Sequence, residues 1–449
     1  MRKLTTDEIA VAVSGTVTGV NTEITSICTD SRKITKGCLF IALVGESFDG
    51  HKFAKSAAEQ GAAAVMCHER VECDCTVINV FDTRAALLDL AGYYRRLFDI
   101  PLIALTGSVG KTTTKEMTYD VVSKKYKTLK NFENLNNEVG LPITVFNLDE
   151  TFEAAVLEMG MNHFGEISRL SRAAKPTMAI MSNIGVAHLE NLGSQENILK
   201  AKLEILEGLT ENAPVILNGD DKFLSGAKIT GHPVYYYGIN NEECDVKAVD
   251  IKEGKLETTF SVLYKDSKTD VVLPTVGIHN VYNALAAFTA GMLMGVKPEE
   301  AAEALGEYKP AGMRQRVNVR KGLTVIEDCY NANPDSMKAA LSILGNMDCR
   351  KIAVLGDMLE LGEISEQAHR EVGQYVAQNK VDYLFTFGEM SKLTAEEAKA
   401  QGVTAYSFDD KAELSELLLK TVKANDCILF KGSRGMKLEE ILHTLYEMF

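Results

Sequence analysis

Short apolar runs alternate with helix-forming stretches through the middle of the chain. Strands that are joined by helical crossovers build a mostly parallel sheet with helices on both faces. The pattern therefore predicts an α/β unit with strands at 102–106, 154–159, 178–183 and 214–218 and helices at 111–125 and 195–208. Residues 234–275 differ, because their short alternating segments favour an antiparallel patch, and helices near 280–294 and 298–306 follow it.

Two further units flank this one. A strand at 37–43, a helix at 53–61 and a strand at 62–66 indicate a small α/β unit near the N-terminus. A second α/β unit begins near Pro310, with strands at 323–328, 352–356, 383–387 and 427–431 and helices at 335–344, 363–379 and 411–423. The 449 residues exceed one typical domain of about 100–200 residues, and we expect three domains, at 1–98, 99–309 and 310–449.

Composition narrows the class of protein. The net charge is −14, which disfavours a general nucleic-acid binder, since such proteins are usually basic. No stretch has the roughly 20 apolar residues of a membrane span, and no N-terminal run resembles a signal peptide. The nine cysteines show neither zinc-ligand spacing nor a disulfide framework, so we expect reduced thiols in a cytoplasmic protein.

Residues 103–114 carry the strongest chemical signal. An apolar strand end leads through small residues and two glycines into a helix start, which is the context of a phosphate-binding loop. Glycines let the backbone approach phosphates, and the N–H groups of a helix start attract anions. Lys111 would reach the β- and γ-phosphates and Thr112 would ligate Mg²⁺, whereas the alternative is an ordinary glycine-rich turn. The predicted ATP-binding loop consists of Thr106, Gly107, Ser108, Val109, Gly110, Lys111, Thr112 and Thr113.

Three further candidates lie near predicted strand ends or on a helix. Glu158 ends a strand, so it lies on the ligand side of a parallel sheet, where its carboxylate could hold Mg²⁺. His188 follows another strand end and could ligate a metal or contact the γ-phosphate. Each has a structural alternative: an exposed acid for Glu158, a structural histidine for His188 and a solvated helical lysine for Lys202.

Other polar loops and helices could contact ligands. Asn136 and Asn137 belong to a polar loop, and Asn280 and Asn283 lie one turn apart on a predicted helix, where both could face one purine. A loop after the strand at 323–328 exposes Asp328, Tyr330, Asn331 and Asn333.

Two anion sites are also candidates. Lys431-Gly-Ser-Arg434 follows the last predicted strand. Ser31 and Arg32 could bind a phosphate or carboxylate through hydroxyl and guanidinium donors, although these residues alone favour a solvated loop.

Together these segments resemble the Mur ligase family of cell-wall peptide synthases, in order and over nearly the whole chain. The matching motifs are the 106–113 loop, Asn134-x-Asn-Asn137 with Gly140-x-Pro142, Glu158-Met-Gly160, Asn183-Ile-Gly-x-Ala-His188, Ala201-Lys202 and His279-Asn-x-x-Asn283. Three stretches are similar to the family member that adds D-alanyl-D-alanine: Asp328-x-Tyr-Asn-Ala-Asn-Pro-Asp-Ser336, Leu355-Gly-Asp-Met-Leu-Glu-Leu-Gly362 with His369, and Lys431-Gly-Ser-Arg434. Asp30-Ser-Arg32 and Asp49-Gly-His51 resemble the family's uridine-diphosphate domain.

The resemblance implies one task for each domain. Residues 1–98 would bind the UDP-muramyl substrate, with Ser31 and Arg32 as contacts. Residues 99–309 would form a central P-loop domain for ATP with a mostly parallel sheet, and 310–449 a Rossmann-like domain that binds D-alanyl-D-alanine and closes on ATP. The enzyme would join D-alanyl-D-alanine to UDP-N-acetylmuramoyl-tripeptide through an acyl phosphate.

The resemblance also implies cofactors and residue roles. It implies two Mg²⁺ ions held by Thr112, Glu158, His188 and a carbamylated Lys202, and these residues other than Thr112 would be catalytic together with Lys111. Asn280 and Asn283 would face adenine, and Arg314 and Asp328 would reach the nucleotide from the third domain. The remaining substrate contacts would be Asn136, Asn137, Tyr330, Asn331 and Asn333. We expect a monomer with no nucleic-acid partner and no membrane span.

Two alternatives stay open. A sister ligase would add one amino acid to a muramyl peptide or glutamate to folate, but the 328–336 loop and the uridine-type first domain argue against it. A P-loop protein that uses ATP only as a regulatory switch would have no obvious use for Glu158, His188 and Lys202. The third residue of the acceptor peptide, lysine or diaminopimelate, is left undecided.

Overall fold

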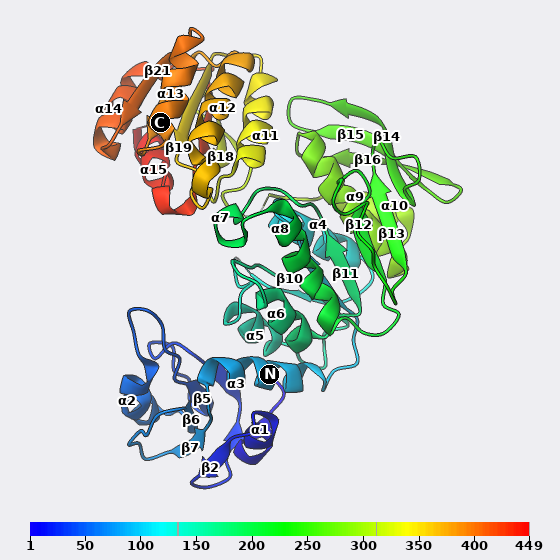
Figure 1. The fold of residues 1–449 in the computed structure, drawn as a ribbon, viewed down its shortest axis with the longest axis vertical. Coiled ribbons are helices and arrows are strands. Elements are labelled where there is room, and N and C mark those ends of the chain that lie inside the picture. Colours follow the sequence, from blue (N-terminus) through cyan, green and yellow to red (C-terminus); the bar gives the residue numbers. More distant parts are fainter. Residues whose placement is uncertain (133, 311, 449) are drawn as a thin grey trace.

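The computed structural model describes residues 1–132, 134–310 and 312–448, which form three α/β domains arranged along one long axis (Figure 1). Each domain contains its own main sheet, as the sequence predicted. Within the described residues, no helix combines the length and the apolar composition that crossing a bilayer would require.

The N-terminal domain is a five-stranded sheet in the order β2-β7-β6-β5-β4, in which only β2 runs antiparallel to its neighbour. Its long helix α3 begins where the Asp82 side chain accepts from the N–H groups of Arg84 and Ala85. Helix α3 lies against the central domain, and the Tyr94 hydroxyl donates to Leu148 O at 2.7 Å across this contact. The elements are β1 (Leu4–Thr5), α1 (Thr6–Ala12), β2 (Thr16–Thr18), β3 (Glu23–Ile24), β4 (Ser26–Cys28), β5 (Cys38–Ile41), η1 (Gly50–Phe53), α2 (Ala54–Glu59), β6 (Ala64–Cys67), β7 (Thr76–Asn79) and α3 (Thr83–Arg95).

The central domain is built on a nine-stranded sheet in the order β16-β15-β14-β13-β12-β11-β8-β10-β9. Strand β8 is buried throughout and lies between β10 and β11. After β8, the chain first forms the strands on the β10 side and then the strands on the β11 side. This is the switch point at which open α/β sheets bind ligands. The elements are β8 (Leu102–Thr106), α4 (Lys111–Ser123), β9 (Thr128–Lys130), α5 (Gly140–Val145), β10 (Ala154–Glu158), α6 (Glu166–Ala174), β11 (Met178–Met181), α7 (Leu189–Leu192), α8 (Gln195–Leu203), η2 (Glu204–Gly208), β12 (Val215–Asn218), β13 (Val234–Gly238), β14 (Val246–Glu253), β15 (Thr258–Tyr264), β16 (Ser267–Leu273), α9 (Ile278–Leu293) and α10 (Pro298–Gly306).

Two sequence-based expectations for this domain are wrong in part. Strand β13 runs parallel to both β12 and β14, and only β14, β15 and β16 form the expected antiparallel patch. A buried, tyrosine-rich strand has the same pattern in either orientation, so the sequence could not decide its direction. The segment expected as a polar loop at 134–142 ends in helix α5, which begins at Gly140, and just before it Asn137 Oδ1 accepts from the Val139 and Gly140 N–H groups.

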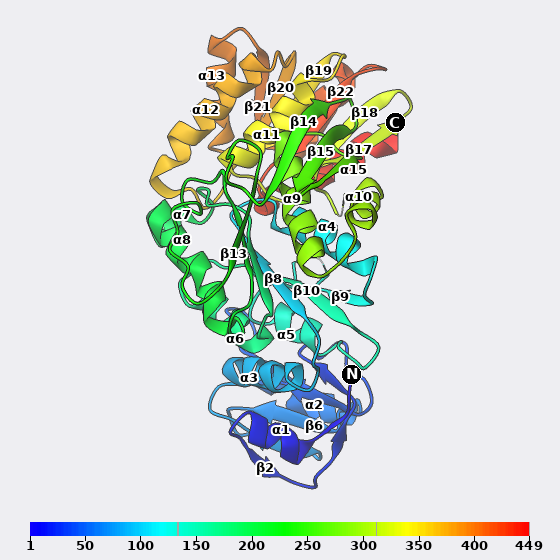
Figure 2. The same cartoon turned by 90° about the vertical axis from the view of Figure 1, so that its right-hand side faces the viewer.

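The C-terminal domain has a six-stranded sheet in the order β17-β18-β22-β19-β20-β21, in which only β17 is antiparallel. It stands above the central sheet, with α11 and α12 toward the central domain (Figure 2). All four predicted strands are present. The elements are β17 (Arg316–Arg320), β18 (Leu323–Asp328), α11 (Pro334–Gly345), β19 (Lys351–Gly356), η3 (Gly362–Ile364), α12 (Ser365–Gln378), β20 (Tyr383–Phe387), α13 (Ser391–Ala400), β21 (Thr404–Phe408), α14 (Lys411–Thr421), β22 (Cys427–Lys431), η4 (Arg434–Met436) and α15 (Glu439–Met448).

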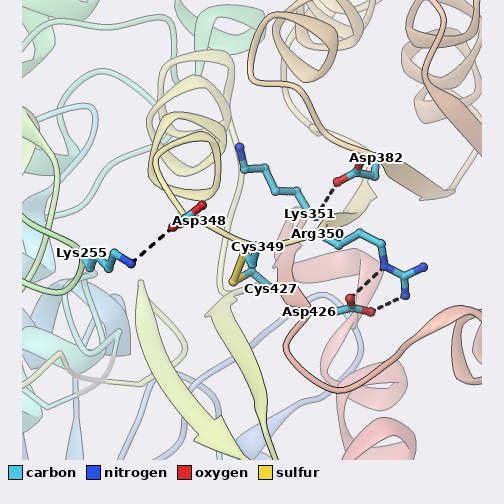
Figure 3. The surroundings of a disulfide bond; sticks show 8 residues. All are labelled: Lys255, Asp348, Cys349, Arg350, Lys351, Asp382, Asp426 and Cys427. Atoms are coloured by element: carbon cyan, nitrogen blue, oxygen red, sulfur yellow. Dashed lines mark hydrogen bonds and ion pairs between the residues drawn. A yellow bond between two sulfur atoms is a disulfide. The ribbon is translucent and has the colours of Figure 1, made fainter.

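One disulfide crosslinks this domain (Figure 3). Cys349 and Cys427 are 78 residues apart in sequence, and their sulfur atoms are bonded. The expectation of reduced cysteines is therefore wrong for this pair. Strand β22 lies beside β19, so Cys349, two residues before β19, lies near Cys427, the first residue of β22, a proximity that spacing in sequence cannot show.

Candidate active site

A cavity of about 730 Å³ opens between the central and C-terminal domains. The ends of β8, β10 and β11 deliver the phosphate loop, Glu158 and Asn183 to it, because these three strands are neighbours in the sheet. Most predicted site residues line it together: Ser108, Val109, Gly110, Lys111, Thr112, Thr113, Asn136, Asn137, Glu158, His188, Asn280, Asn283, Arg314, Asp328, Tyr330, Asn331 and Asn333.

The phosphate loop is held in an open shape by one side chain. The N–H groups of Ser108 and Val109 donate to Asn183 Oδ1 at 3.0 and 2.9 Å, and Asn183 Nδ2 donates back to Val109 O. Gly110 has a φ of +76° and leads directly into α4. The hydroxyls of Thr106 and Ser108 are buried and have no partner among the described residues. The loop thus offers a helix N-terminus and unpaired hydroxyls to an anion.

Beside the loop, a buried carboxylate meets a hydroxyl. Glu158 is 2% exposed, and its Oε2 accepts from the Thr112 hydroxyl at 2.8 Å. Its Oε1 accepts from Asn136 Nδ2 at 2.7 Å. Asn131 holds the backbone of Glu158 on both sides, through bonds to its N–H and carbonyl groups. The carboxylate is therefore fixed in position and has only neutral direct partners.

Two lysines lie close to the loop, and burial lowers the pKa of both. Lys111 Nζ donates to the carbonyl oxygens of Gly107 and Ser108 at 2.9 and 3.3 Å. Lys202 on α8 is 1% exposed, and burial, followed by the charge of Lys111, holds the pKa of Lys202 well below its usual value. Burial thus disfavours the charged form of this amine, and the neutral form is the nucleophile.

His188 lies at the rim of the loop and contacts the opposite domain. It has a φ of +63°, and its Nδ1 is 2.9 Å from Glu360 Oε2. Among the predicted catalytic residues, His188 is thus the one that the C-terminal domain touches directly.

The C-terminal wall of the cavity is organised by an ion pair. Lys431 Nζ donates to Asp328 Oδ2 at 2.6 Å, and both side chains are nearly fully buried. Burial raises the pKa of Asp328, and Lys431 opposes this shift. Next to the pair, the Arg314 guanidinium stacks 3.6 Å above the centre of the Tyr330 ring. Cationic and acceptor groups thus face the phosphate loop across the cavity.

Comparison with known protein families covers the three domains in turn. The family models "Mur ligase family, catalytic domain", "Mur ligase middle domain" and "Mur ligase, glutamate ligase domain" match residues 23–95, 105–291 and 313–434. The chain belongs to the Mur ligase family.

Curated relatives and solved structures match this Mur ligase over its full length. It is 41% identical to the UDP-N-acetylmuramoyl-tripeptide–D-alanyl-D-alanine ligase of Bacillus subtilis, over 100% of this chain and 99% of the relative. The ligase of the same name from Escherichia coli is 35% identical, with the same coverage. MurF from Acinetobacter baumannii has a TM-score of 0.93 at 32% identity, covering 100% and 99% of the two chains. A MurF ligase from Thermotoga maritima in complex with ADP has a TM-score of 0.85 at 30% identity, covering 94% and 97%.

The two asparagines expected at adenine are bonded to protein groups in this Mur ligase. Asn280 Nδ2 donates to Val276 O and to Gln315 Oε1, both at 2.8 Å, and Asn280 Oδ1 accepts from Asn283 Nδ2. Asn283 Oδ1 accepts from the Thr114 hydroxyl and lies where a Cβ at Gly110 would overlap it. Both amides therefore support the loop and the third domain, and their role at adenine stays a prediction.

Asn331 and Asn333, predicted to contact substrate, also have structural tasks. Asn333 is the N-cap of α11, since its Oδ1 accepts from the Ser336 N–H group at 2.9 Å. Asn331 Oδ1 accepts from the Ala332 N–H group at 2.8 Å, and its carbonyl accepts from Lys431. Both still line the cavity.

Five predicted residues do not line the cavity. Thr106 ends β8 and Gly107 begins the loop, where a Cβ at Gly107 would overlap Ser182 Oγ. Lys202 is buried behind the loop. Ser31 and Arg32 follow β4 in the N-terminal domain, where Arg32 pairs with Asp30 at 2.8 Å and lowers the Asp30 pKa to about 2. Their role as substrate contacts stays a prediction.

Sequence reasoning gave no role to several residues of the site. Asn183 and Glu360 belong to motifs that match the family, but a motif does not show which atoms their side chains contact. Asp335, also in a quoted motif, lies where a Cβ at Gly185 would come within 2.9 Å of it. Gln315, with a φ of +52°, accepts from Asn280 and is 2.6 Å from His279 Nε2. No local pattern marks it, because its partners come from another domain.

The groups beside the loop fit a hard divalent cation. The Thr112 hydroxyl and the Glu158 carboxylate are the oxygen ligands that Mg²⁺ prefers. A buried carboxylate with neutral partners is costly, so a cation would compensate its charge.

Proposed function

We propose that this Mur ligase joins D-alanyl-D-alanine to UDP-N-acetylmuramoyl-tripeptide, forming UDP-N-acetylmuramoyl-pentapeptide, ADP and phosphate. The observation that carries the proposal is one cavity in which the phosphate loop and Glu158 face the 328–336 loop. The full-length relatives bear the name of this reaction. A protein that uses ATP only as a switch would need the phosphate loop and Glu158 but not the 328–336 loop.

The reaction needs activation, since a carboxylate has a poor leaving group. An oxygen of the tripeptide's terminal carboxylate attacks the γ-phosphorus, and the bond between that phosphorus and ADP breaks. The neutral amine of the dipeptide then attacks the carbon of the acyl phosphate, and its nitrogen releases one proton to a phosphate oxygen. The tetrahedral intermediate expels phosphate with the bonding electron pair, and an amide remains. Such chemistry asks the protein for positioning and charge neutralisation.

The chain's residues supply both. The N–H groups of the loop and of the α4 start would hold the β- and γ-phosphates, with Lys111 moving from its carbonyl partners to the γ-phosphate. Arg314 would add charge from the opposite wall. Asn183 occupies the Ser108 and Val109 N–H groups in this structure, so these bonds would have to break if the same N–H groups are to hold phosphate.

The metal and lysine chemistry is the finer part of the proposal. Thr112 and Glu158 would hold one Mg²⁺, and His188 with Lys202 would lie near a second; bound Mg²⁺ would neutralise charge on the phosphates. Lys202 would act as a carbamate, formed when its neutral amine attacks the carbon of CO₂ and loses a proton. Its lowered pKa supports this step, because an ammonium could not react and would repel a cation.

The remaining assignments follow from the same reaction. Residues 1–98 would hold the UDP end of the acceptor, 99–309 the ATP and 310–449 the dipeptide. We propose a cytoplasmic monomer, because ATP and nucleotide-linked precursors are cytoplasmic metabolites. The Cys349–Cys427 disulfide is unusual in such a compartment, and counting free thiols in freshly lysed cells would show whether it forms there.

Phosphate release tests the proposal. ATP is mixed with UDP-muramyl-tripeptide carrying lysine or diaminopimelate, with and without D-alanyl-D-alanine, and the product is weighed by mass spectrometry. We expect release that requires both substrates and a product heavier by the dipeptide minus water. Release without regard to the dipeptide would favour a switch, and release with single amino acids would favour a sister ligase.

A further inference from the structure

The 355–362 motif with His369 has no role in the reaction as proposed, yet it forms a firmly held loop. The Met358 N–H group donates to His369 Nε2 at 3.0 Å, and His369 Nδ1 bonds Ser365 O at 2.7 Å. The Leu359 N–H group donates to Ser433 Oγ at 2.9 Å, which ties the loop to the one after β22. His369 is 1% exposed, so this imidazole is an internal brace. The loop is thus fixed before it reaches the cavity.

At its tip the loop places one carboxylate across the cavity. Glu360 has a φ of +64°, a conformation that is strained for any residue with a branched or long side chain. Its Oε2 lies 2.9 Å from His188 Nδ1. Gly362 approaches the backbone of Glu190, and η3 contacts α7, which lies under the C-terminal domain in both views (Figures 1 and 2). Strain at a tip that reaches a predicted catalytic histidine points to function rather than to loop closure alone.

Glu360 and His188 are close enough for a hydrogen bond, although none is formed. His188 Nδ1 is buried, and its N–H group is not aligned with an acceptor in the described part of the chain. A small rotation of the imidazole would align it with Glu360, so the pair is one adjustment away from a hydrogen bond.

This boundary differs from the one between the first two domains. There, α3 packs through buried apolar side chains, and Arg95 donates across the boundary to Ala174 O. At the C-terminal boundary, polar contacts such as Glu360 with His188 and Gln315 with Asn280 occur beside the apolar packing of Val276 on the C-terminal core. Polar contacts of this kind can form and break as a domain moves.

We propose that Glu360 is a positioning residue that couples closure of the C-terminal domain to the orientation of His188. When the domain closes, the carboxylate accepts the proton on Nδ1, and the Nε2 lone pair is left facing the phosphate loop. Ligating histidines usually have such an outer carboxylate, which fixes the tautomer and ring orientation. The C-terminal domain thereby fixes the orientation of a central-domain residue, so the reaction can begin only after this domain has closed. The inference rests on the proposed function.

Three variants test it. Glu360→Gln keeps the length of the side chain, and Glu360→Gly removes the carboxylate while relieving the positive φ. Glu363→Gln is the matched control, an exposed carboxylate three residues further on. We expect kcat to fall about 10- to 100-fold in both Glu360 variants with the KM for ATP unchanged, and no change in the control. Thermal unfolding of Glu360→Gly should not occur at a lower temperature than in the wild type, which separates the effect from misfolding.

Two readouts need no turnover. With Mg²⁺ and a non-hydrolysable ATP analogue, small-angle scattering should show a smaller radius of gyration for the wild type than for Glu360→Gly. Under the same conditions, the imidazole nitrogen shifts of His188 should report Nδ1 protonation only where Glu360 is present. Equal dimensions, the same tautomer or full kcat in Glu360→Gly would overturn the inference. If closure and tautomer change while wild-type phosphate release ignores the dipeptide, the proposed function fails and the inference stands.

Discussion

The central and C-terminal walls of the cavity place their ligand-binding groups through different kinds of contact. The central wall is built around one continuous segment, residues 102–123, in which strand β8, the loop and α4 follow each other, and the bonds that shape the loop join its backbone groups to Asn183. The C-terminal wall collects residues from the loops after β18, β19 and β22, and side-chain bonds hold them together. A wall built around one local segment can bind phosphate as soon as that segment folds. A wall built from several distant loops forms only after the strands of its sheet have paired.

This difference predicts whether a substitution in each wall should reduce activity or stability. Changes to loop side chains that do not shape it, such as Lys111, should remove chemistry and leave the fold intact, because the loop's shape depends on its backbone groups and on Asn183. Changes in the C-terminal wall should cost stability first.

The largest effect is expected for Lys111→Ala. This lysine is the positive group closest to the γ-phosphate site, so its removal withdraws charge stabilisation from the transition state. We expect kcat to fall by at least about 100-fold, or ~3 kcal/mol, with unchanged thermal unfolding. Lys124→Ala is the control, since Lys124 ends the same helix and pairs only with surface glutamates. Turnover that survives in Lys111→Ala would show that the loop does not hold the γ-phosphate.

Lys202→Ala should also be nearly inactive, and it can be rescued. If a carbamate supplies an oxygen anion behind the loop, then formate or acetate can enter the space left by the side chain and restore part of kcat. Lys200→Ala, an exposed lysine on the same helix, should behave as the wild type and gain nothing from carboxylates. A fully active Lys202→Ala would remove the carbamate from the mechanism, and an inactive enzyme without rescue would leave the lysine itself as the required group.

The same division explains what the sequence could predict. Glu158 and His188 were predicted beside the loop because they follow apolar runs, and the neighbouring strands β8, β10 and β11 do bring them there. Local patterns report the element that a residue belongs to. They do not report which loops meet, so the contact of His188 with Glu360, 172 positions later, was out of reach. For the same reason the direction of β13 and the Cys349–Cys427 bond were missed.

On the C-terminal wall, Lys431→Met should reduce stability. It leaves Asp328 buried without its cation, and the loss of one partner from a buried ion pair costs about 3–5 kcal/mol. The double variant Asp328→Leu with Lys431→Met is the control, because an apolar pair of similar volume should recover most of that loss. Denaturant unfolding of the three proteins measures the difference. A single variant as stable as the double one would mean that this wall does not depend on the pair.

The smallest effect concerns the far end of α4, away from the phosphates. Burial raises the pKa of Asp120 to about 6, and Lys130 opposes this shift. The folded protein therefore keeps a proton that the unfolded chain releases near pH 4, so wild-type stability falls as pH rises from about 4 to about 6 and then levels off. Asp120→Asn lacks this term and should be more stable than the wild type at pH 7 by about 1 kcal/mol after solvent screening, with the difference vanishing below pH 4. Urea unfolding across this range measures it. A difference that does not vary with pH would assign the gain to packing, and a change in kcat would show that the helix carries charge effects from its end to the loop.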